Sequence, residues 1–103
     1  MSFFGLFGGG NSDASIEEYL NDGAVVVDVR TVQEFTSGHV KGSKNIVLNT
    51  IPSNVAELKA MNKKVIAVCR SGARSGQATA FLKQQGIDAI NGGPWQDVAK
   101  FVK

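Results

Sequence analysis

The sequence predicts an α/β fold in which a parallel sheet is flanked by helices. Residues 24–29 and 65–68 are almost unbroken apolar stretches, which is the composition of strands that are covered on both faces. Stretches with helical spacing of apolar residues alternate with these strands, and such alternation is typical of a parallel sheet with right-handed crossovers. We therefore expect the two apolar strands at the centre of the sheet.

The remaining elements follow from capping and turn signals. Ser12, Asp13 or Ser15 can cap a first helix, and Thr31 can cap a short helix with Glu34 at the third position of a capping box. In chain order the sequence predicts a helix ending at residue 20, a strand over 24–29, a helix over 32–35, a strand over 45–48, a helix over 52–61, a strand over 65–68, a helix over 77–85, a strand over 87–90, a turn over 91–94 and a helix over 95–102.

Length and composition favour one small domain without a metal site. The 103 residues support a single core, and the net charge of +2 comes from scattered Lys and Arg residues rather than from a basic stripe. We expect no nucleic-acid partner. A single cysteine excludes an internal disulfide and most metal sites, and it fits a reducing compartment such as the cytoplasm. Nothing in the sequence calls for a cofactor.

Residues 1–12 differ in composition from the rest of the chain. This stretch contains Phe and Gly residues but no Lys or Arg, and glycines at 5 and 8 interrupt its apolar part. Such a stretch is a poor signal peptide and is too short to span a membrane. We expect a flexible leader over 1–12 and a domain over 13–103, with a peripheral membrane or partner anchor as the alternative for the leader.

The only cysteine, Cys69, lies where the second apolar strand ends. Ligands of open α/β sheets bind at this place, and the backbone N–H groups of a loop before a helix attract anions. Such a loop, with basic residues nearby, favours the thiolate of a cysteine. We therefore expect Cys69 to be a nucleophile in an anion-binding cradle. The loop residues are Arg70, Ser71, Gly72, Ala73, Arg74 and Ser75.

A second group of polar residues, Asp28, Arg30 and Glu34, follows the first apolar strand. Because carboxyl ends of parallel strands meet at one edge of the sheet, these side chains should lie beside the cysteine and support its loop. Arg74 either binds substrate or pairs with Glu34 or Asp28, and we favour the pairing, partly buried.

The remaining singled-out side chains have separate expected roles. Arg70 is expected to be exposed and to meet anionic donors. We interpret His39 as a hydrogen-bonded structural residue rather than a base for Cys69, and Trp95 as packing near the loop.

Three motifs resemble the rhodanese family. Asp28-Val29-Arg30 with Glu34-Phe35, residues 38–43 and Asn45-Ile46 look like its first signature, residues 69–75 are similar to its active-site loop, and Gly92-Gly93 followed by Trp95 looks like its C-terminal signature. The resemblance covers residues 14–103. It implies a rhodanese-like three-layer fold with about five parallel strands. It also implies transfer of sulfane sulfur, through a Cys69 persulfide, from a donor such as thiosulfate to cyanide or a thiol.

Two other function classes share parts of this pattern. Cysteine-dependent phosphatases and arsenate reductases also use an amide cradle, but with five residues between cysteine and arginine, whereas four separate Cys69 from Arg74. The shorter loop suits one sulfur atom better than a tetrahedral oxyanion. A rhodanese-like module could also only carry sulfur or bind a partner. Since the chain has no second cysteine to resolve a persulfide, sulfur must leave to an external acceptor, a small thiophile or a protein thiol.

Overall fold

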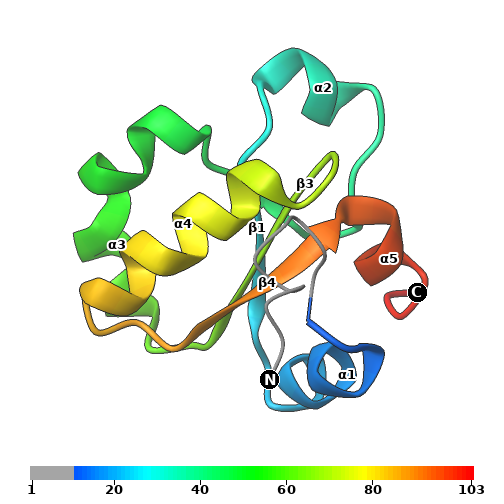
Figure 1. Ribbon diagram of the computed structural model, residues 1–103, viewed down its shortest axis with the longest axis horizontal. Coiled ribbons are helices and arrows are strands. Elements are labelled where there is room, and N and C mark those ends of the chain that lie inside the picture. The colour runs from blue at the N-terminus through cyan, green and yellow to red at the C-terminus, as the bar shows by residue number, and fades with distance from the viewer. Residues whose placement is uncertain (1–10) are drawn as a thin grey trace.

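Four parallel strands form one sheet, in the order β2-β1-β3-β4, in the computed structural model (Figure 1). The structure describes residues 11–103. Within these residues the sheet has four strands, where about five were expected. The elements are α1 (Asp13–Asn21), β1 (Val25–Asp28), α2 (Val32–Thr36), β2 (Lys44–Asn45), η2 (Leu48–Asn54, a 3₁₀ helix), α3 (Val55–Met61), β3 (Val65–Cys69), α4 (Ala73–Gln84), β4 (Ala89–Pro94) and α5 (Trp95–Ala99).

Helices cover both faces of the sheet, so the molecule has three layers (Figure 1). Successive side chains of β1 and β3 point to opposite faces. Val27, Ala67 and Cys69 therefore contribute to a core beneath α3 and α4. Val26 and Ile66 contribute to a second core beneath α1 and α5. This division confirms the predicted α/β class and places Cys69 on the α4 side.

The two apolar strands are central, as predicted. β1 pairs in parallel with β3, with Val25 opposite Val65 and Asp28 opposite Val68. The backbone N–H of Val29 extends the pairing by donating to the carbonyl of Val68 over 3.0 Å. The chain segments that follow β1 and β3 thus leave the sheet at the same edge.

β2 is shorter than the strand predicted over 45–48, and it starts one residue earlier, at Lys44. Only Lys44 and Asn45 form β2, although the backbone N–H groups of Ile46 and Leu48 still donate to carbonyls at the end of β1. The chain then turns into η2, which contains Pro52 and buries Ile51. Pro52 therefore lies within η2, and α3 begins three residues later, at Val55.

The last strand is longer than predicted. β4 continues through residues 91–94, which we expected to form a turn. A register shift opposite Ala67 and Val68 lets the strand stay paired with β3 to its end. Gly92 makes this possible, because a Cβ there would lie only 2.7 Å from the side chain of Ile66 and 2.8 Å from that of Val98. The glycine serves close packing rather than chain reversal.

The flexible leader and the alternative of an anchor, predicted over 1–12, fall mostly on residues 1–10, which lie outside the described residues. Ser12 is the N-cap of α1, and its hydroxyl accepts a hydrogen bond from the Ser15 backbone N–H. Asn11 lies next to β4, where its backbone N–H donates to the Asn91 carbonyl over 2.7 Å. No helix within residues 11–103 combines the length and the apolar character needed to cross a membrane.

Candidate active site

Cys69 is the last residue of β3 and is fully buried. Its Sγ accepts hydrogen bonds from the backbone N–H of Gly72 over 3.0 Å and from that of Ser75 over 3.3 Å. The Oγ of Ser75 lies 3.2 Å from the same sulfur. Two backbone donors, one at the N-cap of α4 and one in its first turn, thus converge on the only cysteine, with the Ser75 hydroxyl beside them.

The loop between β3 and α4 owes its shape to Gly72. This residue is the N-cap of α4 and has φ 105°, in the left-handed region that side chains resist. The helix begins at Ala73, four residues before the predicted start at Gln77. Arg74 and Ser75 therefore belong to the first helical turn rather than to the loop. The positive end of the helix dipole therefore lies at the sulfur, which accepts from the Ser75 N–H of this first turn.

The surroundings of Cys69 favour its thiolate. Burial alone would raise the pKa of the Cys69 thiol, but hydrogen bonds from the Ser75 hydroxyl and from the backbone N–H groups of Ser75, Gly72 and Ser71 together lower this pKa below its ordinary value. The lowered pKa follows from the geometry of the loop and needs no neighbouring base. A sulfur in this setting is a stronger candidate nucleophile than an ordinary buried cysteine.

Arg74 pairs with Glu34, one of its two predicted partners. The guanidinium donates to both carboxylate oxygens over 2.8 and 3.0 Å. This bond, together with the backbone N–H of Thr31, lowers the pKa of Glu34 from 4.5 to about 2. The predicted capping box between Thr31 and Glu34 is present. The side chains of Arg74 and Glu34 are 34% and 31% exposed, so the pair is partly buried.

Asp28 pairs with Arg30 and not with Arg74. The Arg30 guanidinium donates to the Asp28 carboxylate over 2.7 Å at its shortest contact, and both side chains are almost fully buried. Arg30 also donates to the backbone carbonyls of Glu34 and Gly38. These contacts hold the segment between β1 and β2. Asp28 and Arg30 therefore support this neighbouring segment, whereas Glu34 binds Arg74 in the first turn of α4, close behind the cysteine loop.

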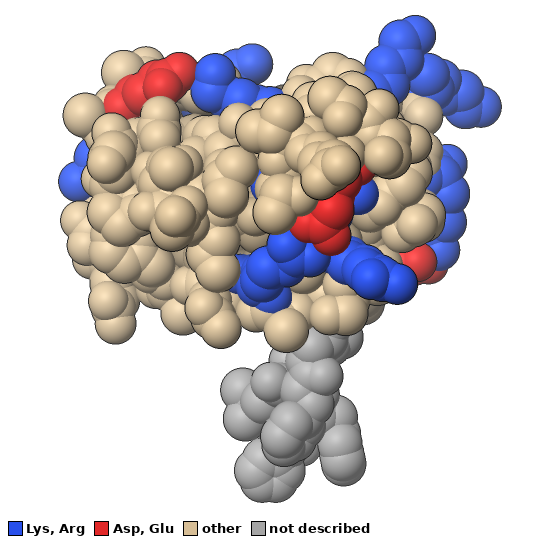
Figure 2. Space-filling view, turned by 90° about the horizontal axis from the view of Figure 1, so that it is seen from above, with Lys and Arg blue, Asp and Glu red and all other residues tan. Residues whose placement is uncertain are grey.

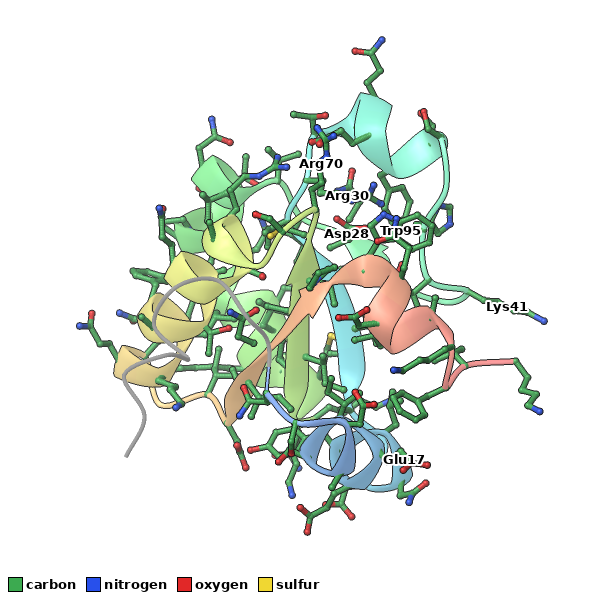
Figure 3. The ribbon with its side chains drawn as sticks, turned by 45° about the vertical axis from the view of Figure 1, so that its right-hand side comes forward. Glu17, Asp28, Arg30, Lys41, Arg70 and Trp95 are labelled. Atoms are coloured by element: carbon green, nitrogen blue, oxygen red, sulfur yellow. The ribbon has the colours of Figure 1, made fainter. Side chains whose placement is uncertain are left out.

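Arg70 lies at the surface beyond the end of β3, at the same end of the sheet as Asp28, Arg30 and Trp95 (Figure 3). It forms no ion pair with any other residue in the described range 11–103. Ser71 and Ala73 are also exposed, while Gly72 and Ser75 are buried. Basic and acidic side chains meet near the middle of this face when the molecule is seen from above (Figure 2). Arg70 is therefore placed to meet an approaching anion.

His39 is a hydrogen-bonded structural residue, as we predicted, and Trp95 packs against the core beneath α1 and α5. The Nδ1 of His39 is 2.7 Å from the Phe35 carbonyl, and its ring stacks on the Phe35 ring at 3.7 Å. Trp95 is half-buried, and the Arg30 guanidinium lies over its ring at 5.0 Å. Neither side chain is a hydrogen-bond partner of Cys69 within the described part of the chain.

Asn91 is the site residue that the sequence analysis missed. Its Oδ1 accepts a hydrogen bond from the Ser75 hydroxyl over 2.6 Å, and its Nδ2 donates to the Gly72 carbonyl over 3.0 Å. We took Asn91 for a turn residue because it begins the sequence Asn-Gly-Gly-Pro. A polar residue directly after the apolar pair Ala89-Ile90 was the available signal, since it follows the point where the apolar part of a parallel strand ends.

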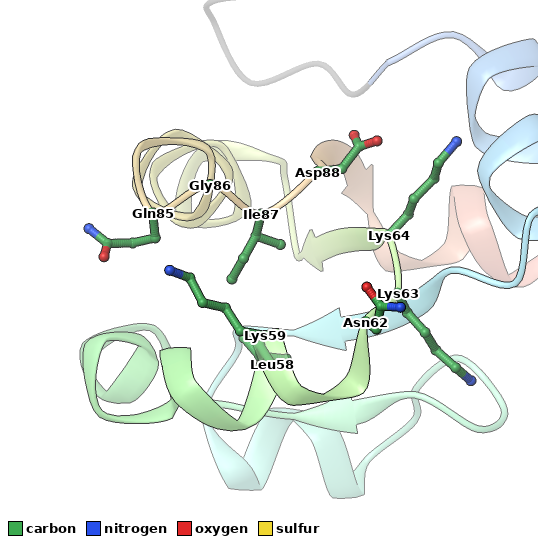
Figure 4. Close-up of a pocket in the computed structure, with 9 residues that line it drawn as sticks. All are labelled: Leu58, Lys59, Asn62, Lys63, Lys64, Gln85, Gly86, Ile87 and Asp88. Atoms are coloured by element: carbon green, nitrogen blue, oxygen red, sulfur yellow. The ribbon is translucent and has the colours of Figure 1, made fainter.

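A surface pocket of about 470 Å³ lies at the opposite end of the strands. It is lined by residues that precede β3 and β4, whereas Cys69 ends β3. Lys59 points across this pocket, but Lys63 and Lys64 point away from it (Figure 4). The pocket is thus separate from the cysteine.

Among residues 11–103, no group of three or more His, Cys, Asp or Glu side chains is placed to hold a metal ion.

Comparison with known proteins gives a consistent assignment. A sulfurtransferase of Allochromatium vinosum is 37% identical over 66 residues, which are 64% of this chain and 61% of that protein. The thiosulfate sulfurtransferase GlpE of Stutzerimonas stutzeri is 33% identical over 68% of this chain and 63% of its own length. The chain thus covers somewhat less than two thirds of these two curated relatives.

Solved structures agree in fold. A rhodanese-related protein from Thermoplasma volcanium superposes with a TM-score of 0.73 at 26% identity, over 92% of this chain and 95% of that one. A rhodanese with anions from E. coli has a TM-score of 0.66 at 30% identity, over 74% of this chain and 92% of that one. The rhodanese-like domain family matches residues 12–93. With the parallel sheet and the loop around Cys69, this match shows that the chain belongs to the rhodanese-like domain family.

Proposed function

We propose that the protein is a rhodanese-type sulfurtransferase that carries sulfane sulfur as a persulfide on Cys69. The observation that carries this proposal is the cradle of Cys69, in which two backbone N–H groups donate to a single sulfur at the start of α4 and the Ser75 hydroxyl lies 3.2 Å from it. Donors fixed in this way stabilise an anionic sulfur throughout a transfer reaction. The sulfurtransferases among the relatives support the same class of reaction.

The proposed reaction has two steps. In the first, the Cys69 thiolate attacks the outer sulfur of thiosulfate, a new S–S bond forms, and sulfite leaves with the electron pair of the broken S–S bond. In the second, cyanide or a thiolate attacks the outer sulfur of the persulfide, and the Cys69 thiolate leaves. The exposed Arg70 attracts the anionic donor, and the N–H groups of Gly72 and Ser75 hold the negative charge in both steps.

A phosphatase or arsenate reductase is the weaker candidate. Such an enzyme needs an arginine that binds the tetrahedral oxyanion, but the Arg74 guanidinium is engaged by both oxygens of Glu34. The loop is also one residue shorter than in those enzymes. A rhodanese-like module that only carries sulfur or binds a partner is the other alternative, and it would load sulfur without turning over. Parallel assays with thiosulfate and cyanide and with a phosphate ester separate these classes.

The decisive variant is Cys69→Ser. The hydroxyl is nearly the same size as the thiol but is not ionised near neutral pH, so we expect thiocyanate formation to fall to the uncatalysed level while the thermal melt is preserved. Mass spectrometry of the wild-type protein after thiosulfate treatment should show the added mass of one sulfur atom, and the variant should not. Substantial turnover by Cys69→Ser would exclude covalent transfer. Loading without turnover in the wild type would favour the carrier module.

The physiological setting stays a prediction. We propose small-molecule sulfur donors and acceptors, with a protein thiol as a further acceptor, because the chain has no second cysteine that could resolve the persulfide. We propose no nucleic-acid partner, and a cytoplasmic location in which the single thiol stays reduced. Fractionation of cells that produce the protein, with detection of the free Cys69 thiol, tests the location.

A further inference from the structure

Asn91 on β4 connects the two residues whose backbone N–H groups bind the sulfur of Cys69. Its amide can lie in only one orientation, because Oδ1 accepts from the backbone N–H of Gly93 over 2.9 Å and Nδ2 donates to the Gly72 carbonyl over 3.0 Å. The first turn of α4 packs closely against this amide, since a Cβ on Gly76 would lie 3.2 Å from Nδ2. The oxygen of the amide is therefore fixed toward Ser75.

The fixed amide decides where the proton of the Ser75 hydroxyl lies. An amide oxygen only accepts hydrogen bonds, so the 2.6 Å contact between Ser75 Oγ and Asn91 Oδ1 requires the single hydroxyl proton of Ser75. The 3.2 Å contact between Ser75 Oγ and Cys69 Sγ then has to use the proton of the thiol. When the thiol ionises, that proton is gone, and the Ser75 hydroxyl can bind the sulfur only by turning away from Asn91.

We propose that Asn91 is a positioning residue for sulfur transfer, which competes with Cys69 for the hydroxyl proton of Ser75. While Cys69 is a thiol, Asn91 holds that proton. When Cys69 loses its proton to solvent, the Ser75 hydroxyl turns to the sulfur, and Asn91 keeps its bond to the Gly93 N–H. No proton passes between the three side chains. Asn91 thus disfavours ionisation of the Cys69 thiol. It also makes the Ser75 hydroxyl available as a hydrogen-bond donor only to an anionic sulfur. The proposal rests on the nucleophilic role of Cys69 proposed above.

Except for the carboxylate that Asn91→Asp adds, the charged groups near the thiol are the same in all variants of the test. They are Arg70 in the loop, Arg74 on α4, Glu34 on α2, and the Asp28–Arg30 pair at the end of β1. Asn91→Ala leaves these charges in place, so a shift in its thiol ionisation reports on the Ser75 hydroxyl or on the loop, whereas Asn91→Asp also acts through its own charge.

The test measures the rate of alkylation by iodoacetamide against pH, in the absence of any sulfur donor. Since Cys69 is the only cysteine, the midpoint of this profile reports its ionisation alone. Asn91→Ala removes the competing acceptor and should lower the midpoint by about half to one pH unit. Asn91→Asp presents a charged acceptor at the same place and should raise the midpoint. Both variants lose the bond to the Gly72 carbonyl, so loosening of the loop would move both midpoints in the same direction.

Repeating the test in Ser75→Ala protein separates the effect of the Ser75 hydroxyl from the effect of a loosened loop. In Ser75→Ala protein, Asn91→Ala should leave the midpoint unchanged, because there is no hydroxyl proton to compete for. Gly76→Ala keeps every hydrogen-bonding group but crowds the amide of Asn91, and should lower the midpoint by less than Asn91→Ala does. Equal shifts with and without Ser75, or shifts of the same sign for Asn91→Ala and Asn91→Asp, would overturn the proposal. Because alkylation needs no sulfur transfer, failure of the sulfurtransferase assay alone leaves this result intact.

Discussion

The Arg74–Glu34 ion pair joins the first turn of α4 to α2, and its strength should depend on pH. The pKa of Glu34 is lowered from 4.5 to about 2. A lowered carboxyl pKa stabilises the folded protein above the ordinary pKa, and this stabilisation is lost as the pH falls through the folded-state value. We therefore expect the difference in thermal midpoint between wild type and Glu34→Gln to be full above pH 4.5 and to shrink between pH 4.5 and about 2.

Arg70 and Arg74, which both follow Cys69 closely in the chain, offer a matched comparison of thermal stability. At neutral pH, Arg74→Ala should lower the thermal midpoint by a few degrees, because the pair is only partly shielded from water. The change should be smaller than that for a fully buried pair. Arg70→Ala removes an exposed side chain and should leave the midpoint unchanged. Adding Glu34→Gln to Arg74→Ala should cause little further loss, and fully additive effects would show that the two side chains act separately.

Single residues differ in how far sequence could predict their contacts. The position of Cys69 at the end of an apolar strand predicted that it belongs to the site. The parallel order of the strands left two candidate partners for Arg74, the carboxylates of Glu34 and Asp28. Choosing Glu34 over Asp28 required knowing that Asp28 is buried against Arg30. The role of Asn91 could not be predicted, because it depends on a hydroxyl sixteen positions earlier in the chain and on the register of β4.

At the scale of elements, β4 depends on Gly92 for its contact with β3 and α5. A methyl group at this position would lie closer to the side chains of Ile66 and Val98 than real contacts allow, and it would also crowd Val68 at 3.0 Å. Gly92→Ala should therefore destabilise the fold by about 1–3 kcal/mol, as overpacking of a tight core does. Urea unfolding measures this change. A stability equal to wild type would mean that β4 can shift at no cost.

Element boundaries were least predictable where a tertiary contact overrides a local signal. The sequence Asn-Gly-Gly-Pro has the composition of a turn, yet pairing with β3 continues through it, with Gly93 at φ 78° where the register shifts. The small residues after Cys69 resemble a loop, yet α4 begins at Ala73 because Gly72 supplies the left-handed cap. By contrast, the capping box of α2 is a local interaction between Thr31 and Glu34, and the sequence predicted it correctly.

At the scale of the whole molecule, the sheet divides the core in two and gathers the site at one edge. The unbroken apolar strands sufficed to predict that β1 and β3 lie at the centre, because both of their faces had to be covered. The shared edge then brought Cys69, Glu34 and Arg30 to the same end of the sheet. The number of strands was not predictable in the same way, since edge strands such as the two-residue β2 bury little apolar surface.

The Asp28–Arg30 pair lies at this end of the sheet, and we expect it to contribute strongly to the free energy of unfolding of the whole domain. The Asp28 side chain is fully buried and that of Arg30 is 6% exposed. Arg30→Met keeps much of the apolar length of the side chain but leaves the buried carboxylate without its partner. Loss of one partner of a buried pair costs about 3–5 kcal/mol. This is a large share of the roughly 5–15 kcal/mol that stabilises a domain.

Urea unfolding of three proteins checks this prediction. Arg30→Met should be the least stable, and adding Asp28→Asn should recover part of the loss, because the second change removes the unpaired charge. Arg30 contacts the segment between β1 and β2 and not the loop of Cys69. A double variant no more stable than Arg30→Met would show that Arg30 acts through its bonds to the Glu34 and Gly38 carbonyls rather than through the charge of Asp28.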